Sequence, residues 1–140
     1  MNTLKSSILV CAPRVLARFP VLFAYLYGSQ ATGAVHPFSD TDIAVFLRED
    51  VLADKMPLES EIALAFDDAI DHSAETDVRA INEMPLMLQG EILTEGLLLY
   101  SIDDQTRISF ETRIRMAYFD FRPTINSYYR NYAADELNAE

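Results

Sequence analysis

Two apolar runs separated by a polar loop limit what this chain can fold into. The first run, residues 21–27, is apolar on both faces, rich in aromatic side chains and followed directly by Gly28. This pattern predicts a strand buried in the middle of a sheet. The second run, residues 41–47, predicts a second strand, with residues 29–39 as the loop between the two. A strand that is apolar on both faces needs cover on both faces, so we expect helices to pack on the sheet.

Helical and extended patterns alternate along the rest of the chain. The remaining predicted elements are a helix over residues 3–18, a helix from Pro57 to about residue 72, a strand over 76–81, a short helix over 85–95, a short strand or extended segment over 96–100, and a long helix that Asp103 caps and that bends or breaks near Pro123. This order predicts a mixed α/β (α+β) fold in which helices flank a small sheet.

The length and charge of the chain limit its organisation and its partners. Its 140 residues fit a single domain, 1–140, with a core over about 5–100 and C-terminal helices over about 103–138. The 22 acidic and 11 basic residues give a net charge of −11, which disfavours direct binding to nucleic acid or to an anionic membrane. The longest apolar stretch is far shorter than the ~20 residues that span a bilayer. Cys11 is the only cysteine, so we expect a soluble, cytoplasmic protein without an internal disulfide.

The loop between the first two strands carries the residues with the clearest chemistry. It opens with Gly28 and Ser29 and ends at Asp40, which is followed by Asp42 on the next strand. Side chains at positions i and i+2 of a strand point to the same face, so Asp40 and Asp42 should lie side by side. A divalent cation removes the repulsion between them, and carboxylate oxygens suit Mg²⁺ or Mn²⁺. Gly28 lets the backbone approach a bulky anion, and the Ser29 hydroxyl can donate to a phosphate.

A third carboxylate is expected from a neighbouring strand. Asp77 lies in the strand-like run 76–81, where a charged side chain needs an explanation. Three carboxylates could hold two metal ions, one at an incoming hydroxyl and one at a triphosphate. The alternative for Asp77 is a solvated position on an edge strand. The alternative for the loop is that Asp40 caps a turn, Asp42 lies on an exposed edge and Ser29 caps a helix.

This set of residues resembles the signature of the nucleotidyltransferase superfamily that includes DNA polymerase β. That signature is Gly-Ser, a spacer, Asp-x-Asp and a later carboxylate on an adjacent strand; here the spacer runs from Gln30 to Ser39. With its short length, the chain looks like the minimal nucleotidyltransferase (MNT) group, the antitoxin halves of HEPN–MNT toxin–antitoxin pairs. The resemblance covers roughly residues 5–100. It implies a polymerase β-like fold with a small mixed sheet and a C-terminal helical extension.

The resemblance also implies an activity and the residues that perform it. Asp40, Asp42 and Asp77 would be the catalytic residues and the ligands of Mg²⁺ or Mn²⁺, and Gly28 and Ser29 would bind the nucleotide. The reaction it implies is transfer of AMP from ATP to a hydroxyl, in the family a tyrosine of a cognate HEPN RNase toxin, which is thereby neutralised. Two alternatives remain: a non-catalytic protein that neutralises its partner by occlusion, and a nucleotidyltransferase that acts on a small molecule.

Four further side chains have both a functional and a structural interpretation. His36 could contact the nucleotide or be exposed to solvent in the loop, and either Arg48 or Lys55 could meet the triphosphate or be a surface charge. Arg79 shares a strand face with Asp77 and could pair with it or contact the nucleotide.

The C-terminal third of the chain is rich in aromatic residues and arginine. Phe110, Ile114 and Phe121 recur at helical spacing and predict a stripe that faces the core. The tyrosines and arginines outside this stripe have the composition of a protein interface, which favours partner binding through that face.

Overall fold

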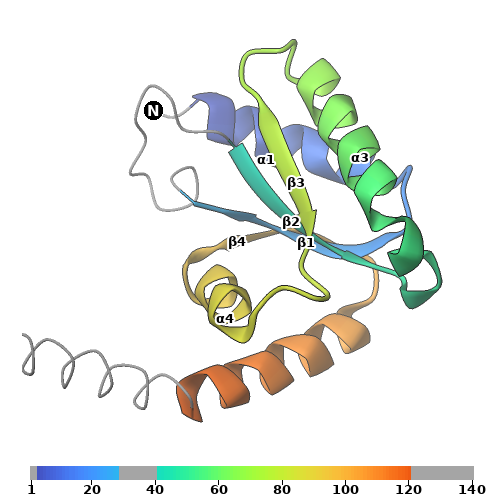
Figure 1. Cartoon of the computed structure of the whole chain (residues 1–140). Helices are drawn as coiled ribbons and strands as arrows, with labels where there is room; N and C mark the ends of the chain where they lie inside the picture. The colour runs from blue at the N-terminus through green and yellow to red at the C-terminus, as the bar shows by residue number, and fades with distance from the viewer. Residues whose placement is uncertain (1–2, 29–40, 121–140) are drawn as a thin grey trace, which may run out of the picture.

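The computed structural model describes residues 3–28 and 41–120, which form a four-stranded sheet with helices on both faces (Figure 1). The elements in chain order are α1 (Thr3–Leu16), β1 (Val21–Tyr27), β2 (Thr41–Leu47), the 3₁₀ helix η1 (Glu49–Asp54), α3 (Lys55–Ala69), β3 (Thr76–Ala80), α4 (Leu86–Glu95) and β4 (Leu97–Ser101). A further helix begins at residue 104 and is described as far as residue 120. We call it the C-terminal helix.

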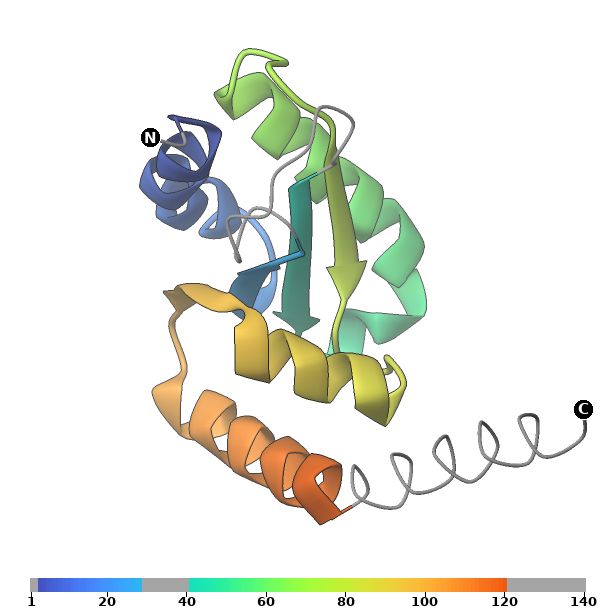
Figure 2. The same cartoon turned by 90° about the vertical axis from the view of Figure 1, so that its left-hand side faces the viewer.

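The sheet is mixed, and its strand order is β3-β2-β1-β4. β1 pairs with β2 and with β4 in antiparallel orientation, whereas β2 and β3 are parallel. The parallel pairing is possible because α3 carries the chain back to the end of the sheet at which β2 begins. Figure 2 shows β2 and β3 side by side and running in the same direction. β1 and β2 are the inner strands, which confirms the buried strand predicted for residues 21–27.

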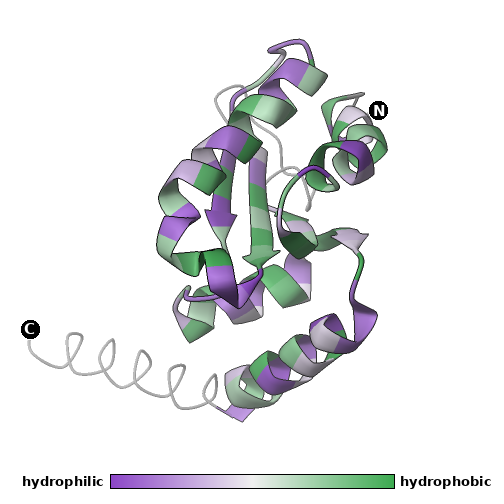
Figure 3. Cartoon of the chain, turned by 90° about the vertical axis from the view of Figure 1, so that its right-hand side faces the viewer, coloured by the Kyte–Doolittle hydropathy of each residue, from purple (hydrophilic) through white to green (hydrophobic). Residues whose placement is uncertain are grey.

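One face of the sheet packs against α1 and α3 (Figures 1 and 2). Leu16 of α1 and Ile62 and Phe66 of α3 are fully buried in this layer. The strands contribute Val21, Ala24, Leu26, Ile43, Val45, Leu47, Val78, Ala80 and Leu99 to the same cluster. Figure 3 shows apolar colouring along β2, whereas β3 at the sheet edge includes hydrophilic positions.

The opposite face packs against α4 and the C-terminal helix. Phe23 and Tyr25 of β1 form a second buried cluster with Ile92 of α4 and with Phe110 and Ile114 of the C-terminal helix. Phe110 and Ile114 lie about one helical turn apart and are each 3% exposed, which confirms that part of the predicted core-facing stripe.

A buried carboxylate ties the C-terminal helix to β1. The Tyr25 hydroxyl donates to Glu111 Oε2 over 2.6 Å, and Arg107 Nη1 donates to Glu111 Oε1 over 3.1 Å. The helix begins as the sequence predicts, because the Thr106 N–H donates to Asp103 Oδ1 over 3.0 Å in an N-cap.

The structure differs from the sequence predictions mainly in the bounds of the elements. η1 follows β2 where no element was predicted. α3 begins at Lys55, so Pro57 lies in its first turn, where the missing proline N–H costs no helical hydrogen bond. The predicted bend near Pro123 lies outside the described residues. Within residues 3–28 and 41–120, no helix is long and apolar enough to cross a membrane.

Candidate active site

Asp42 and Asp77 occupy the second positions of two adjacent parallel strands. They are register partners across β2 and β3. The next residues, Ile43 and Val78, pack toward α1 and α3. Because strand side chains alternate between faces, Asp42 and Asp77 point to the opposite face, on the side of α4. The structure therefore brings together two of the three predicted carboxylates, while Asp40 lies outside the described residues.

Tyr27 extends this pair into a row across three strands. It is the register partner of Asp42 on β1, and its ring packs on the cluster beneath α4. Burial raises the pKa of the Tyr27 phenol to about 12, and the negative charges of Asp42 and Asp77 add to this effect, while Arg79 opposes it. Asp42 and Asp77 thus both lie close enough to the phenol to favour its protonated form.

Gly28 lies at the end of β1 and faces the same carboxylate. Its φ angle is +76°, a left-handed conformation that favours glycine. A β-carbon at this position would collide with the Asp42 carboxylate. Glycine is therefore favoured for two reasons, the backbone conformation and the close approach to the Asp42 side chain. Ser29, the other predicted nucleotide-binding residue, lies outside the described residues.

Asp77 is paired with Arg79, two residues further along β3. Arg79 Nε lies 3.3 Å from Asp77 Oδ2, and the two side chains are 62% and 38% exposed. An ion pair this exposed contributes little to stability, so a cation that binds Asp77 has only a weak interaction to displace. Asp77 has features of both interpretations: it lies on an edge strand, as a solvated carboxylate would, and it lies beside Asp42, as a residue of the site would.

The described part of the site suits a hard divalent cation, although it is not a complete ligand set. Within residues 3–28 and 41–120, no group of three or more His, Cys, Asp or Glu side chains is arranged to hold a metal. Asp42 and Asp77 supply carboxylate oxygens from adjacent strands, and such oxygens suit Mg²⁺ or Mn²⁺. Asp40 is the predicted third ligand.

The other candidate residues occupy different places. His36 lies outside the described residues. Arg48 pairs with Asp50 at 3.1 Å in an exposed position after β2, as a surface charge would. Cys11 is buried in α1, and burial raises the pKa of its thiol. Lys55 begins α3 and lies next to Asp77's strand rather than at Gly28.

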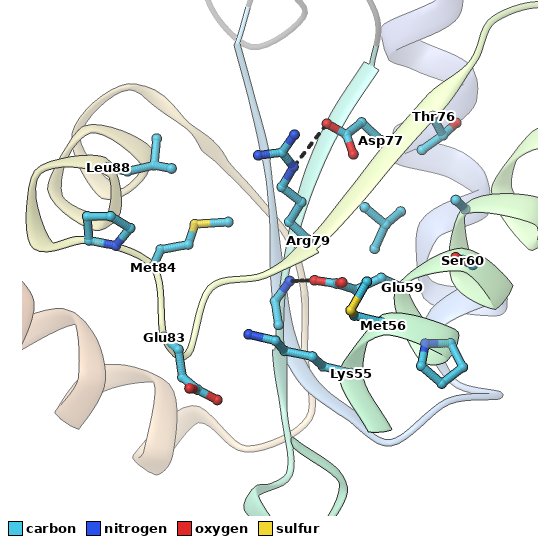
Figure 4. Close-up of a pocket in the computed structure, with 15 residues that line it drawn as sticks. Lys55, Met56, Glu59, Ser60, Thr76, Asp77, Arg79, Glu83, Met84 and Leu88 are labelled. Atoms are coloured by element: carbon cyan, nitrogen blue, oxygen red, sulfur yellow. Dashed lines mark hydrogen bonds and ion pairs between the residues drawn. The ribbon is translucent and has the colours of Figure 1, made fainter. Parts of the chain in front are cut away.

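A groove of about 630 Å³ follows the outer edge of β3, beside Asp77 (Figure 4). The start of α3 forms one wall, and the segment that leads into α4 forms the other. We call it the β3 groove; its lining includes Lys55, Met56, Glu59, Arg79, Met84 and Leu88 in addition to Asp77.

Tyr27 and the β3 groove were not found by reasoning from the sequence. Tyr27 belongs to the apolar run that predicted a buried strand, and its place beside Asp42 depends on the register between β1 and β2. The only local signal was its position directly before Gly28. The groove joins residues from three segments, so no local pattern marks it.

The sequence matches the family described as polymerase beta, nucleotidyltransferase, over residues 14–105. This region contains β1 to β4 with Gly28, Asp42 and Asp77, the residues whose geometry is described above. The chain belongs to the polymerase β nucleotidyltransferase family. The polymerase β-like fold predicted from the Gly28-Ser29 and Asp40-x-Asp42 motifs is thereby confirmed. Comparison with curated protein sequences gives no match.

Solved structures with this nucleotidyltransferase fold include chains from toxin–antitoxin complexes. One is from a tri-AMPylated Shewanella oneidensis HEPN toxin in complex with its MNT antitoxin, with a TM-score of 0.62, 16% identity, and coverage of 92% of this chain and 98% of the other. A toxin–antitoxin structure with AMP-PNP has a TM-score of 0.59 and 17% identity, and the match covers 95% of this chain and 98% of the other. An MntA–HepT complex has a TM-score of 0.60 and 17% identity, and the match covers 95% of this chain and 99% of the other. These likenesses confirm the resemblance to the MNT group at the level of the fold.

Proposed function

We propose that this chain is an antitoxin that transfers AMP from ATP to a hydroxyl, that of a tyrosine, of a cognate HEPN toxin and thereby neutralises it. The observation that carries the proposal is the register pairing of Asp42 with Asp77 beside Gly28. Phosphoryl-group transfer depends mainly on positioning and charge neutralisation, and this arrangement provides two carboxylates on a rigid sheet next to a close backbone approach.

The proposed roles divide among five residues. Gly28 and Ser29 bind the triphosphate, with the Ser29 hydroxyl donating to a phosphate oxygen. Asp40, Asp42 and Asp77 hold Mg²⁺ or Mn²⁺, and Asp77 lies nearest to the incoming hydroxyl. The bound metal would neutralise the triphosphate and make the acceptor hydroxyl more acidic. A tyrosine needs such help at neutral pH because its ordinary pKa is about 10.

The proposed reaction exchanges a phosphoanhydride bond of ATP for a phosphate ester bond to the acceptor. The acceptor oxygen forms a bond to the α-phosphorus of ATP, and the bond from that phosphorus to the bridging oxygen of the β-phosphate breaks. Pyrophosphate leaves with the bonding electrons, and the acceptor's proton passes to solvent. The products are the AMP-modified protein and pyrophosphate.

Support for this acceptor comes from the folds that the chain resembles. The neighbours include a tri-AMPylated HEPN toxin bound to an MNT antitoxin and a toxin–antitoxin structure with AMP-PNP. A second candidate, neutralisation by occlusion alone, is favoured by the exposed apolar side chains of the C-terminal helix. Ile108, Met116 and Phe119 are 53%, 65% and 53% exposed.

Intact-mass spectrometry separates these functions. The partner to be tested is a HEPN protein, which an Arg-x4-His motif in the neighbouring reading frame would identify, and it is incubated with the chain, ATP and Mg²⁺. We expect a mass increase of one or more AMP units with the wild type and with Asp68→Asn, a control carboxylate 73% exposed on α3. We expect none with Asp42→Asn. A partner that Asp42→Asn neutralises without a mass change would support occlusion instead.

A further inference from the structure

We propose that the β3 groove is the docking site for the polypeptide segment that carries the acceptor hydroxyl. This inference rests on the proposed function and names the surface through which the same site would recognise its substrate. The occupant is a segment of the partner protein with an acidic side chain near the acceptor.

The position of the groove relative to the carboxylates fits the acceptor side of the reaction. Gly28 ends β1, Asp42 lies on β2 and Asp77 on β3, so the three residues follow one another across the sheet. The β3 groove borders Asp77 on this outer strand (Figure 4), and Leu88 on its other wall also lines a small pocket at Gly28. In an in-line transfer the nucleophile enters opposite the leaving pyrophosphate. With the triphosphate at Gly28, the nucleophile therefore arrives from the side of the groove.

The edge of β3 is not available for simple strand addition. The N–H groups of Thr76 and Ala80 point away from β2, and they donate to Asp67 Oδ1 over 2.9 Å and to Glu59 Oε2 over 2.7 Å. Carboxylates of α3 thus occupy the donors at both ends of the strand. A segment in the groove would be recognised by side chains rather than by extending the sheet.

The walls of the groove are suited to side chains of a protein partner. Met56 and Met84 extend from opposite walls in Figure 4, and Leu88 lies beyond Met84. Met56 is 72% exposed, which is high for an apolar side chain. Flexible thioether side chains adapt to irregular apolar surfaces, so they favour a polypeptide over a single flat base.

Lys55 places a positive charge in a groove that Arg79 and the carboxylates of Glu59, Asp77 and Glu83 also line. Of these carboxylates, Glu59 accepts from the Ala80 N–H and Asp77 is paired with Arg79. Lys55 lies about one helical turn before Glu59, which accepts from the Ala80 N–H, so the start of α3 lies at the Ala80 end of the groove. Figure 4 shows the Lys55 side chain extending into the space between the walls. Among the described residues, no carboxylate lies within ion-pair distance of the Lys55 ammonium. The three residues from Asp77 to Ala80 span roughly 10 Å of strand. An extended segment covers that distance in about three residues, so an acidic side chain about three positions from the acceptor would reach Lys55.

Steady-state kinetics with the neighbouring HEPN protein and labelled ATP test this assignment. The variants are Lys55→Glu and Met56→Asp, with Leu64→Asp as the control, because Leu64 is also on α3 and 60% exposed but does not line the groove. We expect both groove variants to raise the KM for the partner tenfold or more, with kcat within twofold of wild type and unchanged ATP·Mg²⁺ affinity by calorimetry. Leu64→Asp should match wild type, and melting temperatures identify any variant that fails to fold.

A charge reversal in the partner provides the second measurement. An acidic residue near the acceptor, changed to lysine, should restore the low KM with Lys55→Glu. An unchanged partner KM in both groove variants overturns the proposal. Weakened ATP affinity with an unchanged partner KM also overturns it, because the groove would then bind the nucleoside. If the wild type transfers no AMP, the proposed function fails, and the direct affinity of the partner for Lys55→Glu and Leu64→Asp decides the docking site separately.

Discussion

Gly28 lies so close to the Asp42 carboxylate that a β-carbon at position 28 would stand 2.5 Å from Asp42 Oδ2. The two residues are at the end of β1 and near the start of β2, where the antiparallel pair approaches the loop between them. The contact links the glycine that the sequence assigned to phosphate binding with the carboxylate it assigned to the metal. Any side chain at position 28 must therefore displace the Asp42 carboxylate as well as strain the backbone.

Gly28→Ala should lower the free energy of unfolding by about 1–3 kcal/mol, because alanine is strained at a φ of +76° and its β-carbon contacts Asp42. Gly28→Asn separates the two causes, since asparagine tolerates the left-handed conformation but keeps the β-carbon. Urea unfolding of Gly28→Ala, Asp42→Ala and the double variant measures their coupling. Strictly additive losses in this cycle would show that the Asp42 contact is unimportant.

Asp77→Asn should separate nucleotide binding from transfer. Asp42 lies next to Gly28 and should hold the nucleotide-bound metal, whereas Asp77 lies on the outer strand beside the groove. We expect Asp77→Asn to keep most of its ATP·Mg²⁺ affinity in calorimetry and to lose transfer by a factor of about 10² or more. Asp42→Asn should lose both. Wild-type transfer by Asp77→Asn would remove Asp77 from the site.

Mg²⁺ together with ATP should raise the melting temperature of the wild type. Paired carboxylates repel each other until a cation binds, and a ligand that binds only the folded state stabilises it by mass action. The Asp42→Asn variant should show a smaller shift in a thermal-shift titration, while Asp68→Asn should respond as the wild type does. Equal shifts in all three proteins would place the bound cation elsewhere.

The fold was largely predictable because its strands and helices carry strong local patterns. Residues 21–27 are apolar on both faces, and they form an inner strand. The helix between Thr41–Leu47 and Thr76–Ala80 favours a parallel pair, because such a connection needs a crossover. The sequence did not decide between a strand and an extended segment near Leu97–Ser101, because this segment is a strand only through its pairing with β1.

The candidate site was predictable only in part. The types and spacing of its residues can be read from short segments, but the pairing of the strands that carry them cannot. The spacing of Asp40 and Asp42 and the position of Gly28 can be read from one segment. That Asp77 lies opposite Asp42 depends on the register of β2 with β3, which α3 packing sets at long range. Tyr27 lies in the site because β1 pairs with β2. The apolar run that contains it indicated only a core residue.

Gly90→Ala should disturb the contact between α4 and the C-terminal helix. A β-carbon at position 90 would overlap the ring of Tyr118, so the two helices must separate or the ring must rotate. Overpacking of this kind costs about 1–3 kcal/mol, which urea unfolding would detect. The double variant Gly90→Ala/Tyr118→Ala removes the overlap and should lose less stability than the two single losses added together. A double variant that is merely additive would contradict this account.

Tyr25→Phe should change how stability depends on alkaline pH. Burial raises the pKa of Tyr25, and the Glu111 carboxylate that accepts its hydrogen bond raises it further. An unfolded tyrosine loses its proton near pH 10, whereas Tyr25 in the folded protein keeps it to higher pH. The folded state therefore binds more protons above pH 10, so the contribution is present in full below pH 10 and is lost as the pH rises. For one such group the free energy of unfolding falls by up to about 1.4 kcal/mol per pH unit.

In Tyr25→Phe this part of the decline should disappear, so the variant's stability falls less steeply than that of the wild type between pH 10 and 11. At neutral pH the variant should be less stable by about 1–2 kcal/mol, because Glu111 loses a donor while keeping Arg107 at 3.1 Å. Urea unfolding of both proteins at pH 7 and at steps from pH 9 to 11 measures the two effects. Parallel curves across the alkaline range would mean that Tyr25 titrates alike in the folded and unfolded chain, and that the hydrogen bond to Glu111 does not hold its proton.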